Sequence, residues 1–170
     1  MPPPDAALQA RAVAHAQALA EALDYVGVFA LELFCRDGVL LANELAPRVH
    51  NSGHWTIEGS ETSQFQNHLR AVLGLPLGDT RMVGHACMLN WIGAMPDASA
   101  VLREAGGHWH DYGKEPRDGR KVGHATLRAD APVELRQHER HAHAFGGPRP
   151  GLVGTVRGDA HLITRERQRS

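Results

Sequence analysis

Two glutamates stand out in the first third of the sequence because they break a strand-like apolar pattern. Glu32 lies inside the run VFALELF, and Glu44 follows the run VLLAN. Burying a carboxylate costs free energy unless it finds a counter-charge or a metal ion. Two readings stay open from spacing alone. The pair holds a cation such as Mg²⁺, or each carboxylate binds a nearby arginine, Arg36 or Arg48.

The separation of the two carboxylates depends on how the two apolar runs pair. If they form an antiparallel hairpin about Asp37, Glu32 faces Ala42 and lies diagonal to Glu44. Diagonal neighbours have Cβ atoms about 7–8 Å apart, within reach of two glutamates that share one metal ion. The sequence therefore predicts that both carboxylates lie on one face at the open end of the hairpin.

A polar loop follows the second glutamate and carries Arg48, His50, Asn51 and Ser52. The planar fork of an arginine matches a small oxyanion, and a histidine can donate to that anion or move a proton near neutral pH. Ser52 and Gly53 would let the backbone approach a ligand closely. The alternative is a turn ordered by local side-chain bonds. In either case His54 and Trp55 are expected to shape the loop rather than to react.

A second group of charged residues surrounds the turn at 116–119. It consists of Lys114, Arg117, Arg120 and Lys121. Such a cluster on a tight turn can clamp a phosphate group, although the residues alone favour a solvated basic turn. Just before it, His108 and His110 flank an indole, and we interpret that segment as packing at the edge of the core.

The elements that must position these residues follow from apolar periodicity and from turn signals. The predicted helices are 6–23, 64–73 (opened by Ser60, Glu61 or Thr62) and 98–104, and the predicted strands are 26–35, 39–44, 84–92, 107–112 and 121–128. A turn at 36–38 joins the first two strands into a hairpin.

Bulk properties narrow the class of protein. The sequence has 170 residues, with 18 Lys and Arg against 19 Asp and Glu, so no nucleic-acid or membrane surface is expected. No apolar run of roughly 18 residues indicates a membrane helix. Two cysteines make no disulfide framework, which favours a cytoplasmic protein.

Several segments together resemble a known family. The segments are Tyr25–Val28, Leu31–Phe34, Asn43–Trp55, Ser63–Phe65, His68–Arg70 and Gly119–His124. In these residues the stretch 24–130 resembles the C-terminal part of 5-(carboxyamino)imidazole ribonucleotide synthases, which are ATP-grasp ligases. The resemblance implies an α+β fold: the C-terminal half of an ATP-grasp domain, with an antiparallel sheet and helices, followed by a small, mostly β C-terminal domain and a disordered tail. The implied boundaries are 1–80, 81–136 and 137–170.

The resemblance also implies an activity and a set of roles. The enzyme would use ATP and Mg²⁺ to carboxylate 5-aminoimidazole ribonucleotide with bicarbonate, as a homodimer. Glu32 and Glu44 would bind the metal, and Asn43 and Glu44 would contact the nucleotide. Many ATP-grasp proteins place a third ligand, an asparagine, two residues after the second glutamate; here that position is Ala46, which leaves Asn43 as the nearest amide.

The substrate roles are carried over in the same way. The resemblance assigns Arg48, His50 and Asn51, together with Ser52, to bicarbonate and to catalysis. Lys114 and Arg120 would hold the 5′-phosphate of the ribonucleotide.

The same comparison leads to the expectation that the chain is a truncated piece of such an enzyme and is inactive alone. No glycine-rich loop precedes the hairpin, and the two lysines are Lys114 and Lys121. Two alternatives remain: another ATP-grasp carboxylase or formyl-transferring relative, and a catalytically silent fragment or binding module that keeps the substrate loop.

Overall fold

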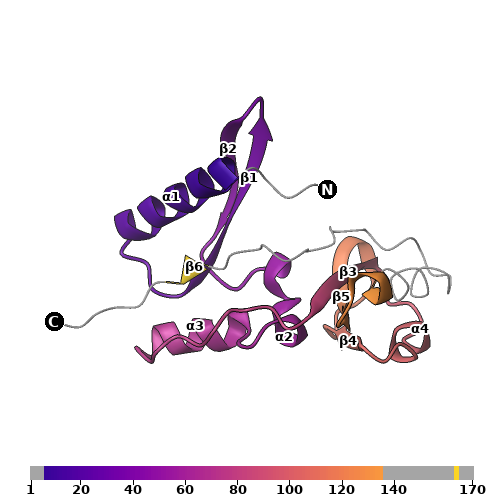
Figure 1. Cartoon of the computed structure of the whole chain (residues 1–170). Helices are drawn as coiled ribbons and strands as arrows, with labels where there is room; N and C mark the ends of the chain where they lie inside the picture. The colour runs from indigo at the N-terminus through magenta and orange to yellow at the C-terminus, as the bar shows by residue number, and fades with distance from the viewer. Residues whose placement is uncertain (1–5, 136–162, 165–170) are drawn as a thin grey trace. The chain divides into compact units, whose positions relative to one another are not determined.

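The computed structural model describes residues 6–135 and 163–164 of the chain (Figure 1). These residues form two compact units. The first comprises 6–53, 62–80 and the short strand β6 (Ile163–Thr164), and the second comprises 54–61 and 81–135. The segment 54–61 thus clusters with the second unit. The predicted tail, 137–170, lies outside the described residues apart from β6.

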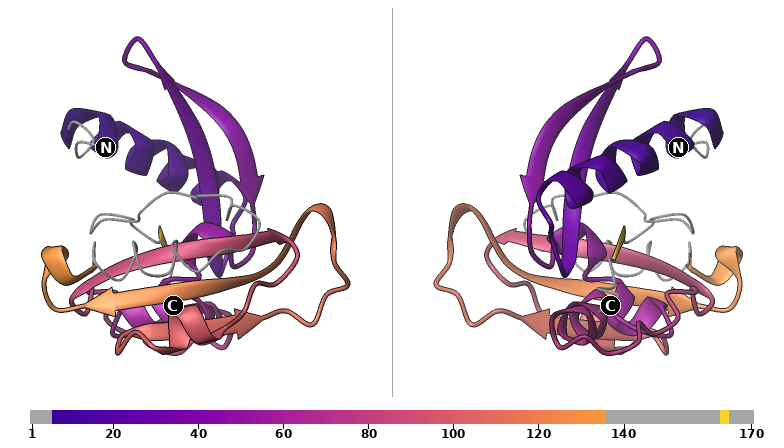
Figure 2. Two further views of the ribbon diagram at one scale, coloured as in Figure 1. Left: turned by 90° about the vertical axis from the view of Figure 1, so that its right-hand side faces the viewer. Right: turned by 90° about the vertical axis from the view of Figure 1, so that its left-hand side faces the viewer.

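The first unit is a helix packed on an antiparallel sheet. Helix α1 (Ala6–Ala22) precedes β1 (Val28–Arg36) and β2 (Val39–Ala46), and the strand order is β2-β1-β6. Ala16 and Ala20 of α1 are buried against Phe29 of β1. The views in Figure 2 show α1 lying along the hairpin. The predicted helix and hairpin are confirmed.

The hairpin turns over two residues and then changes register. Asp37 and Gly38 both have positive φ, 52° and 76°, as in the tight turns that suit the twist of paired strands. Regular pairing from this turn would put Asn43 opposite Glu32. Instead a β-bulge adds one residue to β2, and Glu32 pairs with Glu44. The predicted register, with Glu32 opposite Ala42, is therefore wrong by two positions: the turn is centred on Asp37 and Gly38 rather than on Asp37 alone, and the bulge adds one more residue.

The loop after β2 contains the short 3₁₀ helix η1 (Asn51–Gly53), and α3 (Gln64–Val72) completes the first unit. Helix α3 begins at Gln64 as predicted, but its capping residue is Ser63, one residue after the last of the predicted openers. Ser63 caps it, accepting from the Gln66 backbone N–H, while the Gln66 side chain accepts from the Ser63 N–H. The helix buries Gln64 and Asn67, and the Asn67 amide bonds both backbone groups of Gly78.

The second unit is a three-stranded antiparallel sheet with two short helices. Helix α2 (Thr56–Gly59) is followed by β3 (His85–Gly93), α4 (Ser99–Leu102), β4 (Gly107–Asp111) and β5 (Arg117–Ala129). The strand order is β3-β5-β4, and Figure 2 shows β3 and β5 as two long neighbouring strands. An apolar core that includes Leu89, Trp91, Val101 and Leu127 covers one face of the sheet.

Two further observations bear on the class of protein. Among the described residues, no helix combines the length and apolar character that crossing a membrane requires. Cys35 and Cys87 are both free thiols, as expected without a disulfide framework.

Candidate functional site

The carboxylate pair, Glu32 and Glu44, is built by the β-bulge in the hairpin. Directly paired residues of two strands share a face, and alternate residues lie on opposite faces. Without the bulge Asn43 would face Glu32, and Glu44 would lie on the other side of the sheet. The extra residue in β2 puts Glu44 directly opposite Glu32. The two carboxylates thus share one face, in direct rather than diagonal register.

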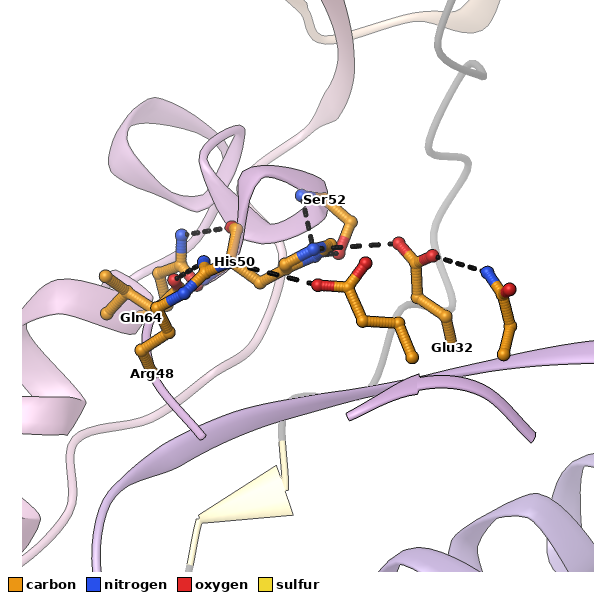
Figure 3. A network of polar contacts seen from close by, with 8 residues as sticks. Glu32, Arg48, His50, Ser52 and Gln64 are labelled. Atoms are coloured by element: carbon orange, nitrogen blue, oxygen red, sulfur yellow. Dashed lines mark hydrogen bonds and ion pairs between the residues drawn. The ribbon is translucent and has the colours of Figure 1, made fainter. Parts of the chain in front are cut away.

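Both carboxylates remain open to solvent and contact polar side chains (Figure 3). Glu32 Oε2 accepts from Asn43 Nδ2 at 3.2 Å, and Glu32 Oε1 lies 3.6 Å from His50 Nε2. Glu44 Oε1 lies 3.9 Å from Arg48 Nη2. The Glu32 side chain is 41% exposed and the Glu44 side chain 50%. Contacts this long and this exposed are cheap to exchange for a ligand.

The loop that follows is held by a buried glutamine. Gln64 Oε1 accepts from the His50 backbone N–H at 3.0 Å, and Gln64 Nε2 donates to the His50 carbonyl at 2.8 Å. A Cβ atom at Gly53 would come within 2.7 Å of Gln64 Oε1, so this close approach requires glycine. His50 Nδ1 in turn lies 2.8 Å from Ser52 Oγ. Figure 3 shows His50 between Ser52 and Glu32. The loop is therefore ordered around His50.

The donor set fits a hard divalent cation that also binds a ligand. Two carboxylates and an amide, from Glu32, Glu44 and Asn43, offer oxygen atoms, which Mg²⁺ prefers. Across residues 6–135 and 163–164, no three His, Cys, Asp or Glu side chains form a metal cage by themselves. Mg²⁺ commonly completes its coordination with water and with substrate phosphates. The arginine alternative is present in part, since Arg48 contacts Glu44 whereas Arg36 lies 4.0 Å from Asp37.

Of the predicted loop residues, Arg48, His50 and Ser52 join the carboxylate pair through these contacts. Arg48 also donates to the Val49 carbonyl at 3.1 Å. Asn51 opens η1 in the same loop.

The predicted phosphate residues lie in the second unit, around the connection between β4 and β5. Lys114 Nζ stands 5.1 Å from the centre of the Tyr112 ring. Arg120 lies on β5, and its Nη1 donates to the Glu115 carbonyl at 3.4 Å. The predicted turn at 116–119 is wrong, because β5 already begins at Arg117 and the connection between β4 and β5 is 112–116. The contacts of Lys114 and Arg120 leave both positive charges available to an anion.

Sequence reasoning missed a set of ionisable residues in the second unit, of which His124 is buried and the others are partly buried. We call this set the histidine array: Glu58, His110, His124 and Tyr112. Its members come from α2, β4, β5 and the loop after β4, so no sequence spacing reveals them. The only signal is the HWH segment, where Trp109 packs on Trp91 in the core as expected. His110 instead meets Glu58, with His110 Nε2 2.7 Å from Glu58 Oε1.

Burial governs the charge of His124. The residue is 1% exposed, and burial lowers its pKa to about 3, with the nearby charges of His110 and His54 acting in the same direction. His124 is therefore neutral near neutral pH. Its Nδ1 lies 2.8 Å from the Tyr112 hydroxyl oxygen.

Both units match known protein families. A family model for the ATP-grasp domain matches residues 2–65, and one for the phosphoribosylaminoimidazole carboxylase C-terminal domain matches residues 86–138. The chain is 62% identical over 121 residues to the N5-carboxyaminoimidazole ribonucleotide synthase of Pseudomonas aeruginosa. That match covers 71% of this chain and 34% of the relative, so the chain spans about a third of the length of such relatives.

Solved structures that match this chain are also of N5-carboxyaminoimidazole ribonucleotide synthases. The N5-carboxyaminoimidazole ribonucleotide synthetase from Thermus thermophilus matches with a TM-score of 0.78 at 56% identity, over 85% of this chain and 40% of that chain. The enzyme of Aspergillus clavatus in complex with ADP and 5-aminoimidazole ribonucleotide matches with a TM-score of 0.61 at 39% identity, over 68% of this chain and 34% of that chain. With matches of this strength in both units, the chain belongs to the N5-carboxyaminoimidazole ribonucleotide synthase family of ATP-grasp ligases.

Proposed function

We propose that this chain takes part in the ATP-dependent carboxylation of 5-aminoimidazole ribonucleotide with bicarbonate, which gives N5-carboxyaminoimidazole ribonucleotide for purine biosynthesis. The observation that carries the proposal is the carboxylate pair, Glu32 directly opposite Glu44, with Arg48 and His50 in contact with it. Oxygen ligands for a cation and donors for a small oxyanion thus occur side by side within one unit.

Each group of residues has a distinct task in this proposal. Glu32 and Glu44 hold Mg²⁺, and Asn43 lies beside them to contact the nucleotide. When bound, Mg²⁺ and ATP supply the phosphoryl group and offset its charge during transfer. Arg48 offers its guanidinium fork to bicarbonate, displacing its weak contact with Glu44.

The remaining loop residues serve the small substrate. His50, whose ring is held by Ser52 and whose backbone is held by Gln64, donates to bicarbonate or takes up a proton. Asn51 supplies an amide in the same loop. Bicarbonate accepts the γ-phosphoryl group to give carboxyphosphate, which breaks down to CO₂ and phosphate. The amine of the ribonucleotide then adds to CO₂ and loses a proton.

Lys114 and Arg120 bind the 5′-phosphate of the ribonucleotide in this proposal. Their support is the position of Lys114 in the connection between β4 and β5, that of Arg120 on β5, and the Aspergillus clavatus relative, whose structure contains 5-aminoimidazole ribonucleotide. A homodimer and a cytoplasmic location complete the proposal, and sedimentation of the purified protein tests the first of these.

The experiment is to place this chain in a working enzyme. Residues 6–135 replace the matching segment of the Pseudomonas aeruginosa synthase, and ADP release is measured with the ribonucleotide and bicarbonate varied separately. We expect ADP release that requires both substrates. Release without the ribonucleotide, or with another amine as acceptor, would overturn the assigned substrate.

The substitution Arg48→Ala in this chimera tests whether Arg48 binds bicarbonate rather than ATP. We expect the KM for bicarbonate to rise about tenfold or more, because a charge-assisted bidentate contact is lost, while the KM for ATP stays nearly unchanged. Arg36→Ala is the matched control, since Arg36 lies at the far end of the same hairpin. An unchanged bicarbonate dependence in Arg48→Ala would make Arg48 a structural residue.

A further inference from the structure

The histidine array lies on the sheet face opposite the apolar core of the second unit. Asn90, His124 and His110 pair across β3, β5 and β4 and therefore share a face. The neighbouring row, Leu89, Ala125 and Trp109, belongs to the apolar core on the other face. The sheet thus carries a row of polar side chains across its centre, where apolar residues would be the ordinary choice.

The members of the array contact one another in sequence from Glu58 to Tyr112. After the Glu58–His110 contact of 2.7 Å, the His110 and His124 rings stack with centres 4.2 Å apart and planes at 11°. His124 then meets the Tyr112 hydroxyl at 2.8 Å. A continuous line of polar groups therefore connects α2 with the residue that follows β4.

Stability alone does not explain this array. Within the part of the chain that the structure describes, Glu58 Oε2 and His124 Nε2 are buried without a hydrogen-bond partner. A buried polar network that is only partly satisfied is less stable than apolar packing of the same volume. What the array does achieve is a fixed orientation of Tyr112.

Tyr112 is the residue at which the backbone leaves the sheet, at the start of the connection 112–116 that carries Lys114. Its backbone N–H donates to the Val122 carbonyl at 3.0 Å, and the chain from Tyr112 to Pro116 then runs outside any strand. Lys114 rests over the Tyr112 ring, at 5.1 Å from its centre. A lysine side chain has four rotatable bonds, and ordering it on binding costs affinity. A ring that holds its ammonium group in advance reduces that cost.

We propose that the histidine array positions Lys114: Glu58, His110 and His124 fix the Tyr112 ring through its hydroxyl, and the ring holds the ammonium group in place for a phosphate monoester. The inference rests on the proposed function, which assigns Lys114 to the ribonucleotide phosphate. It adds four residues that act through the lysine and do not touch the substrate.

The test uses the full chain and ribose 5-phosphate as the probe, with affinity measured by calorimetry. Tyr112→Phe keeps the ring and removes the hydroxyl, and we expect the dissociation constant to rise about three- to tenfold. In the Lys114→Gln background the same change should have no effect, because a positioning effect needs the group that it positions. Tyr25→Phe is the matched control: it removes the other tyrosine hydroxyl, which donates to the Val28 carbonyl in the first unit.

A second measurement needs no ligand. The sequence has two lysines, Lys114 and Lys121, so the ε-methylene protons of Lys114 are readily assigned by NMR. We expect the ε-methylene protons of Lys114 to show an upfield ring-current shift. This shift should be smaller in Tyr112→Phe and in His124→Gln, while the chemical shifts of the Lys121 protons should not change.

The outcomes separate the inference from the proposed function. If Lys114→Gln binds ribose 5-phosphate like the unmodified chain, or if the unmodified chain does not bind it, the phosphate assignment is wrong. If Lys114→Gln weakens binding but Tyr112→Phe does not, or weakens it equally in both backgrounds, the positioning role is wrong and the assignment stands. A Lys114 chemical shift that is unchanged in both Tyr112→Phe and His124→Gln also refutes the positioning role.

Discussion

The carboxylate pair and the histidine array are both made of ionisable side chains, yet the protein keeps them in opposite surroundings. Glu32 and Glu44 lie on the hairpin, about half exposed, with contacts of 3.2–3.9 Å. His124 is buried on the sheet of the second unit, 2.8 Å from the Tyr112 hydroxyl and stacked on His110, which itself lies 2.7 Å from Glu58. Exposed groups exchange partners cheaply, whereas buried groups hold one arrangement.

The difference shows two ways of building a site. The register of the two strands places the carboxylates opposite each other, so their position depends on the number of residues in β2. Their side chains remain available to bind a cation. Side-chain packing places the histidines, and their contacts are with other members of the array, Glu58 and Tyr112. The first region is therefore sensitive to changes of chain length, and the second to changes of protonation.

The largest expected effect comes from adding one alanine between Leu41 and Ala42. With one bulge retained, the longer strand would bring Asn43 opposite Glu32 and turn Glu44 to the other face. We expect ADP release by the chimera to fall about 100-fold or more, since misplaced catalytic groups cost that much. Deleting Asn43 is the matched control: it removes the bulge but leaves Glu44 opposite Glu32, so the loss should be under about tenfold. Equal losses in both variants would refute the register argument.

The next effect concerns the second unit and pH. Because the folded pKa of His124 is about 3, the unfolded chain binds more protons than the folded chain below the ordinary histidine pKa of about 6.5. Stability is therefore complete above that pH and falls as pH drops from about 6.5 toward 3. Between pH 7 and 5 we expect a loss of about 2 kcal/mol in the free energy of unfolding.

Urea unfolding followed by tryptophan fluorescence measures this loss, because Trp55, Trp91 and Trp109 all lie in the second unit. The other ionisable side chains around His124 are His54, beside its ring, and His110 and Glu58 within the array. The variant His124→Gln separates the contribution of these groups from that of His124. In this variant the free energy of unfolding should change less between pH 7 and 5. A slope that survives unchanged in this variant would assign the acid sensitivity to other groups.

The smallest effect is expected in the exposed region. Glu44→Gln removes a 3.9 Å ion pair with Arg48 and should change the free energy of unfolding by less than about 0.5 kcal/mol. Glu58→Gln, which alters the buried 2.7 Å contact with His110, should cost more than about 1 kcal/mol. Thermal melting followed by circular dichroism compares the two. A larger loss from Glu44→Gln would contradict the contrast between the regions.

Much of the first unit could be read from the sequence. Strand alternation and the Asp37-Gly38 turn predict a hairpin with Glu32 and Glu44 on one face, which the structure has. The register could not be read, because neither the two-residue turn nor the bulge disturbs the apolar pattern. The correct face followed from a wrong pairing: the turn and the bulge each shift the register by one residue, and a total shift of two keeps Glu44 on the predicted face.

The histidine array could not be predicted in the same way. Glu58, His110 and His124 meet only after three strands and a helical turn have assembled, and local periodicity contains no information about that assembly. Gln64 has a role that is easier to recognise from the sequence. It lies three residues before Asn67 in α3, and polar residues at that spacing on the buried side of a helix indicate backbone partners.

Gln64 has a mechanical consequence. Its amide meets both the N–H and the carbonyl of His50, as a peptide group of a neighbouring strand would. The loop around His50 is thereby fastened to the first turn of α3, and the two should move as one rigid body. A displacement of that helix would then carry His50 with it.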